Sequence, residues 1–222
     1  MRTDASKQAD GKVLRRDAAE NRQRLLDAAA TVFSERGLDV GVDEIARVAG
    51  VGIGTLYRRF PTKDALVSEL VRQVLQEFVA LAHEASSAPN GEGLEQVLYG
   101  TGAILASNRG CLSRMWNDDE TTSLRDEYRW ILFELLARAK QHGRIREDAT
   151  DADLDLIFWS VRGVVTTTRG VTDTGWRRIM AIMIAGLRPG ADDLDADPMS
   201  AHHLTEIMDR FRHSEDQPPN RD

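Results

Sequence analysis

One short basic segment of this sequence gathers side chains that could bind a chain of phosphate groups. Thr55 and Tyr57 carry hydroxyl groups, and Arg58 and Arg59 carry guanidinium groups. Hydroxyls of this kind donate to phosphate oxygens, and an arginine can bind either a phosphate or the edge of a guanine with two hydrogen bonds. Lys63 follows a few residues later and adds an ammonium group. These residue types therefore indicate contact with nucleic acid.

Two short helices joined by a tight turn must position these side chains. Asp43–Ala49 has the apolar side of an amphipathic helix, and Gly50 can adopt the positive φ that a tight turn between helices needs. The second segment, Gly52–Phe60, points Leu56 into a small core and ends before Pro61, which lacks a backbone N–H. This is the helix-turn-helix pattern, in which the second helix enters a DNA major groove. An ordinary αα-hairpin inside a helical bundle is the alternative.

The flanking sequence predicts an all-α protein. Asn21–Arg36 has apolar residues at 3.6-residue spacing and predicts a firm helix that packs against the hairpin. Thr62 can cap a further helix that connects the hairpin to the rest of the chain. The later segments are also helical in pattern, and none shows the alternation of a strand. We therefore expect a flexible N-terminal arm, a helix-turn-helix domain, a helical body and an acidic tail that can form a last helix, at residues 1–20, 21–65, 66–188 and 189–222.

The charge of the chain is unevenly distributed. The net charge of the 222 residues is −7, yet residues 1–70 hold 12 Lys and Arg against 11 Asp and Glu. The acidity therefore lies in the later part, which suits a DNA-binding head on a separate acidic body. No apolar run reaches the length of a membrane span, the N-terminus has no hydrophobic signal core, and Cys111 is the only cysteine. These features predict a cytoplasmic protein that does not bind membranes.

Chemistry other than binding finds no support in the sequence. It contains no Gly-rich phosphate loop, no nucleophile elbow and no HExxH motif, so we expect no enzymatic activity and no cofactor. Histidines and acidic residues near the C-terminus have helical spacing. Because no cysteine joins them, we expect no metal site there.

The region from Asn21 to about Phe78 resembles the DNA-binding domain of TetR-family transcriptional regulators. The resemblance rests on Arg36-Gly37, Asp43-Glu44-Ile45-Ala46, Ala49-Gly50-Val51, Gly54-Thr55-Leu56-Tyr57, Phe60-Pro61 and Lys63-Asp64-Ala65-Leu66. It implies a homodimer whose two recognition helices enter successive major grooves of a near-palindromic, double-stranded DNA operator. One departure from the family pattern concerns the start of the first hairpin helix. Gly41 and Val42 stand where relatives commonly have a capping threonine or serine.

The resemblance also implies roles for residues of the hairpin. Phosphates would be held by Thr55, Tyr57 and Lys63. Bases would be read at positions that vary between relatives, which here are Ile53, Gly54, Arg58 and Arg59. Arg47 in the preceding helix is a further candidate DNA contact. The sequence leaves open whether Ile53 contacts a thymine methyl group or folds inward beside Leu56.

For the body, the resemblance implies a small-molecule site and a dimer interface made by the last two long helices. The apolar faces of these helices are so wide that burying them requires a second protein surface. Candidate ligand contacts are aromatic or polar residues on otherwise apolar helices, namely Trp116, Tyr128, Phe158, Trp159 and Arg162. Arg162 needs a partner, which is either Asp155 in a structural ion pair or a carboxylate of the ligand. For the aromatic residues, core packing is the alternative to pocket lining.

These observations together predict a DNA-binding transcriptional regulator. In its most specific form the prediction is a dimeric repressor that a small molecule of unknown identity releases from its operator. A helical protein-interaction module, whose hairpin binds another protein and no operator, is the alternative. Salt-sensitive and sequence-specific binding to DNA separates the two.

Overall fold

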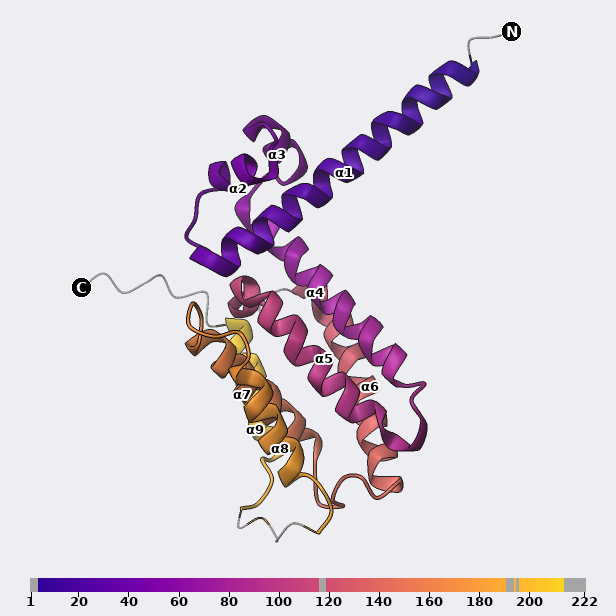
Figure 1. Ribbon diagram of the computed structural model, residues 1–222, viewed down its shortest axis with the longest axis vertical. Coiled ribbons are helices and arrows are strands. Elements are labelled where there is room, and N and C mark those ends of the chain that lie inside the picture. The colour runs from indigo at the N-terminus through magenta and orange to yellow at the C-terminus, as the bar shows by residue number, and fades with distance from the viewer. Residues whose placement is uncertain (1–3, 116–118, 191–193, 195, 214–222) are drawn as a thin grey trace, which may run out of the picture.

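The protein is helical in all the secondary structure that its computed structural model describes, which covers residues 4–115, 119–190, 194 and 196–213 (Figure 1). No strand occurs within these ranges, and the expected all-α class is confirmed. The α-helices are α1 (Asp4–Arg36), α2 (Val42–Ala49), α3 (Ile53–Arg59), α4 (Lys63–Ala85), α5 (Gly93–Ser107), α6 (Thr122–Gln141), α7 (Asp151–Thr167), α8 (Gly175–Gly186) and α9 (Ala201–His213). Short 3-10 helices are η1 (Pro89–Gly91), η2 (Arg109–Arg114) and η3 (Asp119–Thr121).

The first helices form a small head on an elongated helical body (Figure 1). The core of the head combines one or two large apolar side chains from each of its helices. At most 1% of the surface of each of these residues is exposed, and they are Leu25, Phe33, Ile45, Leu56 and Leu66. Burying each such side chain contributes about 1.5–3 kcal/mol. This core fixes α2 and α3 on α1 and on the first turn of α4.

Helix α1 begins earlier than the sequence analysis expected. A flexible arm was expected before Asn21, whereas the backbone is helical from Asp4. Residues 4–20 contain no proline and are rich in Ala, Lys and Arg, which are strong helix formers. Figure 1 shows this part of α1 extending away from the head. Intrinsic propensity therefore accounts for the helical backbone that the search for an apolar stripe missed.

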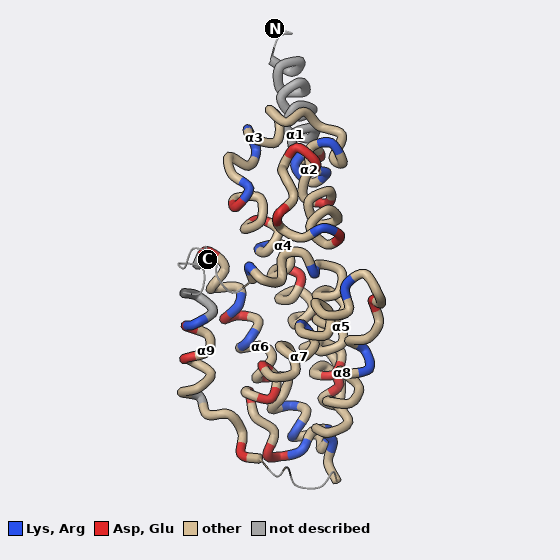
Figure 2. The backbone as a smooth tube through the Cα atoms, turned by 90° about the vertical axis from the view of Figure 1, so that its left-hand side faces the viewer, with Lys and Arg blue, Asp and Glu red and all other residues tan. Residues whose placement is uncertain are grey.

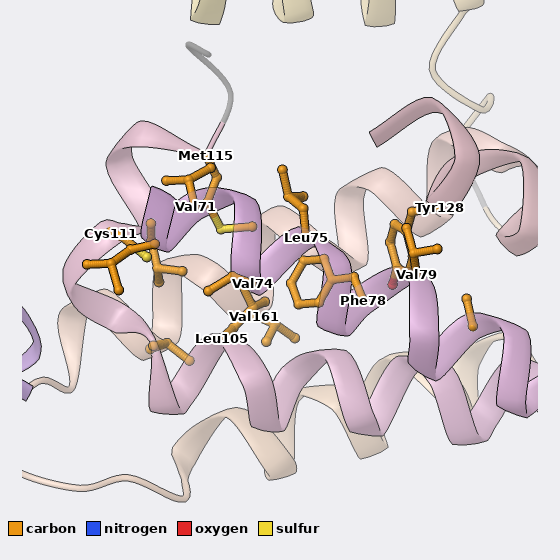
Figure 3. Packing of buried hydrophobic residues seen from close by; sticks show 14 of the residues in the cluster. Val71, Val74, Leu75, Phe78, Val79, Leu105, Cys111, Met115, Tyr128 and Val161 are labelled. Atoms are coloured by element: carbon orange, nitrogen blue, oxygen red, sulfur yellow. The ribbon is translucent and has the colours of Figure 1, made fainter. Parts of the chain in front are cut away.

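The body is organised around α4, which starts in the head and continues through the bundle (Figure 1). Its apolar stripe lies in the interior, where Figure 3 shows Val71, Val74, Leu75, Phe78 and Val79. Around them pack side chains from several other elements, including Leu105 of α5, Cys111 of η2, Met115, Tyr128 of α6 and Val161 of α7. Helix α4 thus connects head and body, as its wide stripe predicted.

A second junction between head and body lies at the C-terminal end of α1. Helix η2 approaches so closely that a Cβ atom added to Gly110 would collide with the backbone of Phe33 and Ser34. From the turn between α7 and α8, the Arg169 guanidinium donates from Nη2 to the Phe33 carbonyl oxygen at 3.0 Å. This places a positive charge at the negative end of the α1 dipole. The head is therefore connected to the body through α4 and through the contacts of η2 and Arg169 with the C-terminal end of α1.

Helix α9 lies to one side of the bundle (Figure 2). It begins at Ala201, where the sequence predicted a last helix, and its Leu204 is buried, whereas Ile207 and Met208 are half-buried. Among the helices that the structure describes, none is both long enough and apolar enough to cross a bilayer.

Candidate functional site

The α2–α3 turn sets the angle at which α3 is presented. Gly50 adopts φ 67° and ψ 31°, in the left-handed region, and its N–H bonds back to carbonyls at the end of α2. Gly52 then caps α3 in an extended conformation, and its carbonyl oxygen accepts from the Thr55 N–H at 2.8 Å. Glycine at position 50 thus serves the turn that the sequence predicted.

Helix α3 divides into a buried face and an exposed face. Leu56 and Phe60 are 0% and 4% exposed and anchor the helix in the head core. Ile53 is 44% exposed and Tyr57 is 49% exposed, so the question that the sequence left open for Ile53 is settled in favour of the outward position. The rest of the exposed face consists of Gly54, Arg58 and Arg59, with Thr55 half-buried beside them. Figure 2 shows the basic residues of α3 in blue.

Gly54 leaves an unfilled space on this exposed face. A Cβ atom built at this position has no neighbour within 4 Å. Glycine in a helix interior costs about 0.5–1 kcal/mol relative to alanine. Because no contact within the described chain demands glycine here, its absent side chain leaves room for another molecule to approach the backbone of α3.

Arg47 has a structural role that the sequence analysis did not expect. Its guanidinium makes two hydrogen bonds with Glu44, Nη2 to Oε1 at 2.7 Å and Nε to Oε2 at 2.8 Å. Arg36 of α1 donates to the same carboxylate from Nη1 at 3.1 Å. The hydrogen bond from Arg47, with smaller contributions from both guanidinium charges, lowers the pKa of Glu44. Arg36 therefore links α1 to α2 through Glu44, whereas Arg47 pairs with this carboxylate within α2 and would have to leave it to contact DNA.

Lys63 opens α4 at the edge of the α3 surface. It is half-buried, and its Nζ lies 5.9 Å from the centroid of the Phe33 ring. Thr62 caps the helix as predicted, with its hydroxyl oxygen accepting from the Ala65 N–H at 3.0 Å. By contrast, Gly41 gives α2 no side-chain cap, as the sequence indicated. The first turn of α4 therefore places both a lysine and the positive end of a helix dipole beside α3.

The body holds a groove of about 490 Å³ between α6, the start of α7 and α9. A smaller apolar cleft of about 30 Å³ continues inward from it between α4, α6 and α7. The two share four lining residues at their junction, which are Arg125, Arg129, Phe133 and Asp151. The cleft is walled by apolar and aromatic residues, mainly Leu75, Phe78, Tyr128, Leu132, Leu154 and Phe158. A polar groove thus leads into an apolar interior.

The ligand contacts predicted from sequence fall in several places. Tyr128 and Phe158 line the cleft, and both pack against Phe78, with ring centroids 5.2 Å and 6.2 Å away. Tyr128 also shares a 2.6 Å hydrogen bond with the Thr101 hydroxyl, while burial raises its pKa. Trp159 and Arg162 line neither the groove nor the cleft. Trp116 lies outside the described residues.

Asp155 does not form the hypothesised ion pair with Arg162, because it pairs with another arginine. Asp155 Oδ2 lies 3.2 Å from Nη2 of Arg129 on α6. Burial nevertheless raises the pKa of Asp155, with the Arg129 charge acting in the opposite direction. Burial also lowers the pKa of Arg162. The pairing across α6 and α7 depends on tertiary packing, which spacing along α7 alone could not reveal.

Two arginines of α6 were missed as candidate site residues. Arg125 is only 5% exposed, and it donates to the Met115 carbonyl oxygen at 2.9 Å and to hydroxyls of two neighbouring threonines. Arg129 sits over the Phe133 ring at 5.5 Å from its centroid. Both lie on the same helical face as Tyr128 and Leu132, at spacings of three and four residues. That spacing was the sequence signal by which these two arginines could have been found.

Comparison with known proteins finds similarity both to the head and to most of the chain. Residues 25–70 match the family model described as bacterial regulatory proteins of the TetR family. The transcriptional repressor KstR2 of Rhodococcus jostii is 26% identical over 202 residues, which cover 85% of this chain and 89% of that protein.

Solved structures give the same result over most of the chain. The TetR transcription regulatory protein of Mycobacterium vanbaalenii is 31% identical, with a TM-score of 0.58 over 79% of this chain and 99% of that one. The TetR regulator SCO0520 of Streptomyces coelicolor is 29% identical, with a TM-score of 0.56 over 77% and 99%. The chain belongs to the TetR family of transcriptional regulators, as its helix-turn-helix motifs predicted.

Proposed function

We propose that this protein is a repressor that binds a near-palindromic DNA operator as a homodimer and is released by a small molecule. The exposed face of α3 is the observation that carries the proposal. Ile53, Tyr57 and the two arginines stand on a helix whose other side is anchored in the head core. A rigid, protruding and basic helix of this kind fits a major groove.

The proposed division of labour on this face follows the chemistry of each side chain. The Tyr57 phenol and the Thr55 hydroxyl suit phosphate oxygens, as does Lys63 at the start of α4. Arg58 and Arg59 can each donate two hydrogen bonds to a guanine edge, and Ile53 can contact a thymine methyl group. Gly54 lets the backbone of α3 approach the bases.

Exposed apolar surface on α7 and α8 supports the proposed homodimer. Leu156 of α7 is 39% exposed and Ile182 of α8 is 52% exposed, although both helices belong to the body. Gly163 and Gly186 have no neighbour within 4 Å of an added Cβ, so nothing in the described chain fills the space beside them. Small residues between exposed large ones let two helix pairs approach closely. A two-fold dimer would bury this surface against its own copy.

The groove of the body supports the proposed small-molecule response. Its volume of about 490 Å³ lies within the usual range for ligand sites. The apolar cleft beside it touches α4, the helix that leads to the head. A ligand that widened the cleft would displace α4 and thereby change the distance between the two recognition helices of a dimer.

A reporter gene placed behind the DNA that precedes this protein's own gene tests repression. The chain should lower reporter expression, and the double variant Arg58→Ala, Arg59→Ala should restore most of it. Arg138→Ala is the matched control, because Arg138 is an exposed arginine on α6 in the body. Activation by the wild-type chain would refute repression while keeping DNA binding. Equal repression by wild type and the double variant would refute the role of α3.

A further inference from the structure

A largely buried carboxylate joins α1 to α4 at the border between head and body. Glu69 lies on α4 between Leu66, which belongs to the core of the head, and Val71, which faces the interior of the body (Figure 3). The Glu69 side chain is only 12% exposed, and its Oε1 lies 2.5 Å from Nη2 of Arg22 on α1. The ion pair therefore connects two helices at the point where α4 leaves the head.

Arg22 extends this connection to the end of α3. Its guanidinium carbon lies 5.6 Å from the centroid of the Phe60 ring, and Phe60 is the residue at which α3 ends. The Phe60 N–H donates to the Leu56 carbonyl oxygen at 2.8 Å, so the ring is attached directly to the last turn of α3. One guanidinium group therefore contacts both the end of α3 and the carboxylate of α4.

The carboxylate of Glu69 also binds Arg72, but this second pair stays within α4. Arg72 donates to Oε2 of Glu69 from Nε at 3.0 Å and from Nη2 at 2.6 Å. Burial acts to raise the pKa of Glu69, but the hydrogen bonds from Arg72 and Arg22 outweigh burial and lower that pKa. Of the two arginines that share the carboxylate, only Arg22 links different elements of the fold.

Two separated contacts determine the direction of α1 relative to the body. Near its C-terminal end, α1 is contacted by η2 and by Arg169 at the Phe33 carbonyl oxygen. A helical rise of about 1.5 Å per residue separates Arg22 from Phe33 by roughly 16 Å. A helix held at one end can turn about that end, whereas a helix held at two such points cannot. Because α4 continues into the body, the pair of Arg22 with Glu69 supplies the second point.

We propose that Glu69 is a positioning residue for DNA binding, which acts through Arg22 to hold the head, and with it α3, at a fixed angle to the body. This inference rests on the proposed function, because it concerns how the two copies of α3 in a homodimer meet two half-sites. One added base pair between the half-sites turns one of them by about 35° around the DNA axis. A head that could turn would have to be ordered on binding, which costs affinity and relaxes the preference for one spacing.

A series of operators with different half-site spacings tests the proposal in the full-length chain. Glu69→Gln keeps the shape of the side chain and removes its charge, and Arg22→Met removes the ion pair and keeps an apolar contact with Phe60. Each variant should lower the preference for the best spacing over spacings one base pair longer or shorter by about two- to fivefold. Base preference within each half-site should not change. Arg72→Met is the matched control and should keep the spacing preference of the wild type, because its pair with Glu69 joins no two elements.

The double variant Arg22→Met, Glu69→Gln should lose no more spacing preference than either single variant, because both changes remove the same link. A purely structural role of Glu69 predicts a different result. Affinity would then fall by the same factor at every spacing, together with the midpoint of thermal unfolding, and the proposal would be overturned. An unchanged spacing preference in Glu69→Gln, or an equal loss in Arg72→Met, would overturn it as well.

A distance measurement without DNA separates this inference from the function on which it rests. Spin labels on Val48→Cys in the head and Ala137→Cys in the body, both at exposed positions, report the head-to-body distance by double electron–electron resonance. An excess of unlabelled chain leaves one labelled chain in each dimer. Glu69→Gln and Arg22→Met should broaden the distance distribution, whereas Arg72→Met should not. If the chain binds no operator, the proposed function fails, but an unchanged width in Glu69→Gln is the result that would refute positioning by Glu69.

Discussion

At the scale of single residues, the exposed face of α3 separates side chains that build the head from side chains that face outward. Tyr57 illustrates the difference, because almost half of its surface is exposed although the neighbouring Leu56 is completely buried. An exposed aromatic ring contributes little to the core of the head. Its phenol hydroxyl is therefore free to serve an interaction with another molecule.

Gly54→Ala should separate stability from DNA binding. The added methyl group enters open space, and alanine is the better helix former, so the midpoint of thermal unfolding should rise or stay unchanged. Binding to operator DNA should weaken, because the methyl group holds the backbone away from the bases. Gly110→Ala is the matched control, because its methyl group collides with the α1 backbone and should lower the midpoint. A lower midpoint for Gly54→Ala would contradict this account.

Tyr57→Phe and Lys63→Ala should weaken binding to every DNA sequence by similar factors. Losing one phosphate hydrogen bond costs about 0.5–1.5 kcal/mol, or roughly two- to tenfold in affinity. For Lys63→Ala the slope of log affinity against log salt should also fall by about 1. Lys140→Ala is the control, since its Nζ donates to the Glu147 carbonyl oxygen in the body. Unchanged binding of both variants in salt-titrated gel shifts would remove these residues from the interface.

Residue types and motif spacing were enough to predict which segment carries the basic face. They could not predict which way Ile53 points, because α3 is only seven residues long and its orientation is set by the Gly50 turn and the head core. They also could not show that Glu44 binds Arg36, because Arg36 belongs to another helix, whereas the pairing of Glu44 with Arg47 follows from their spacing of three residues within α2. Contacts between two helices cannot be predicted from the spacing of residues within one helix.

At the scale of elements, the joint between head and body depends on the C-terminal end of α1. The periodic stripe of α4 predicted one connection, and the structure adds the contact of η2 and Arg169 with α1. Nothing in the spacing of residues 107–115 or 168–174 predicts that these segments meet α1, because the sequence separation exceeds a hundred residues for Arg169 and Phe33. The same limit explains why the groove beneath α9 was missed.

Arg169→Met should loosen the end of α1. The charged hydrogen bond to the Phe33 carbonyl oxygen disappears, and a hydrogen bond of this kind contributes about 1.5–3 kcal/mol when well formed. Amide hydrogen exchange should therefore speed up at Phe33 to Gly37 and remain unchanged in α3. Arg138→Met, an exposed position in α6, is the control. Unchanged exchange at the end of α1 would show that α4 and η2 hold the head without this contact.

At the scale of the whole molecule, the acidic body and the basic face of α3 lie at different places on an elongated chain (Figure 2). The overall net charge of −7 would disfavour DNA if it were evenly spread. A dimer would present two copies of the basic face and would bury the exposed apolar residues of α7 and α8. Assembly and DNA binding are therefore linked in this account.

Ile182→Asp should produce monomers and reduce operator affinity without unfolding the chain. Ile182 is 52% exposed, so a carboxylate there stays in water in the monomer and becomes buried against its own copy only in the dimer. Sedimentation analysis measures the mass, and thermal unfolding checks the fold. Trp130→Asp is the control, because Trp130 is 63% exposed on α6, away from the proposed interface. A monomeric wild-type chain, or a dimeric Ile182→Asp variant, would contradict the proposed interface.

The most direct test of the central claim is a footprint of the chain on the DNA that precedes its own gene. We predict two protected half-sites related by approximate two-fold symmetry, with their centres separated by about one helical turn, roughly 10 base pairs, or a multiple of it. The protection should weaken as salt rises and should disappear with the double variant Arg58→Ala, Arg59→Ala. Protection that is absent, or that persists unchanged in the double variant, would contradict the claim that α3 reads an operator.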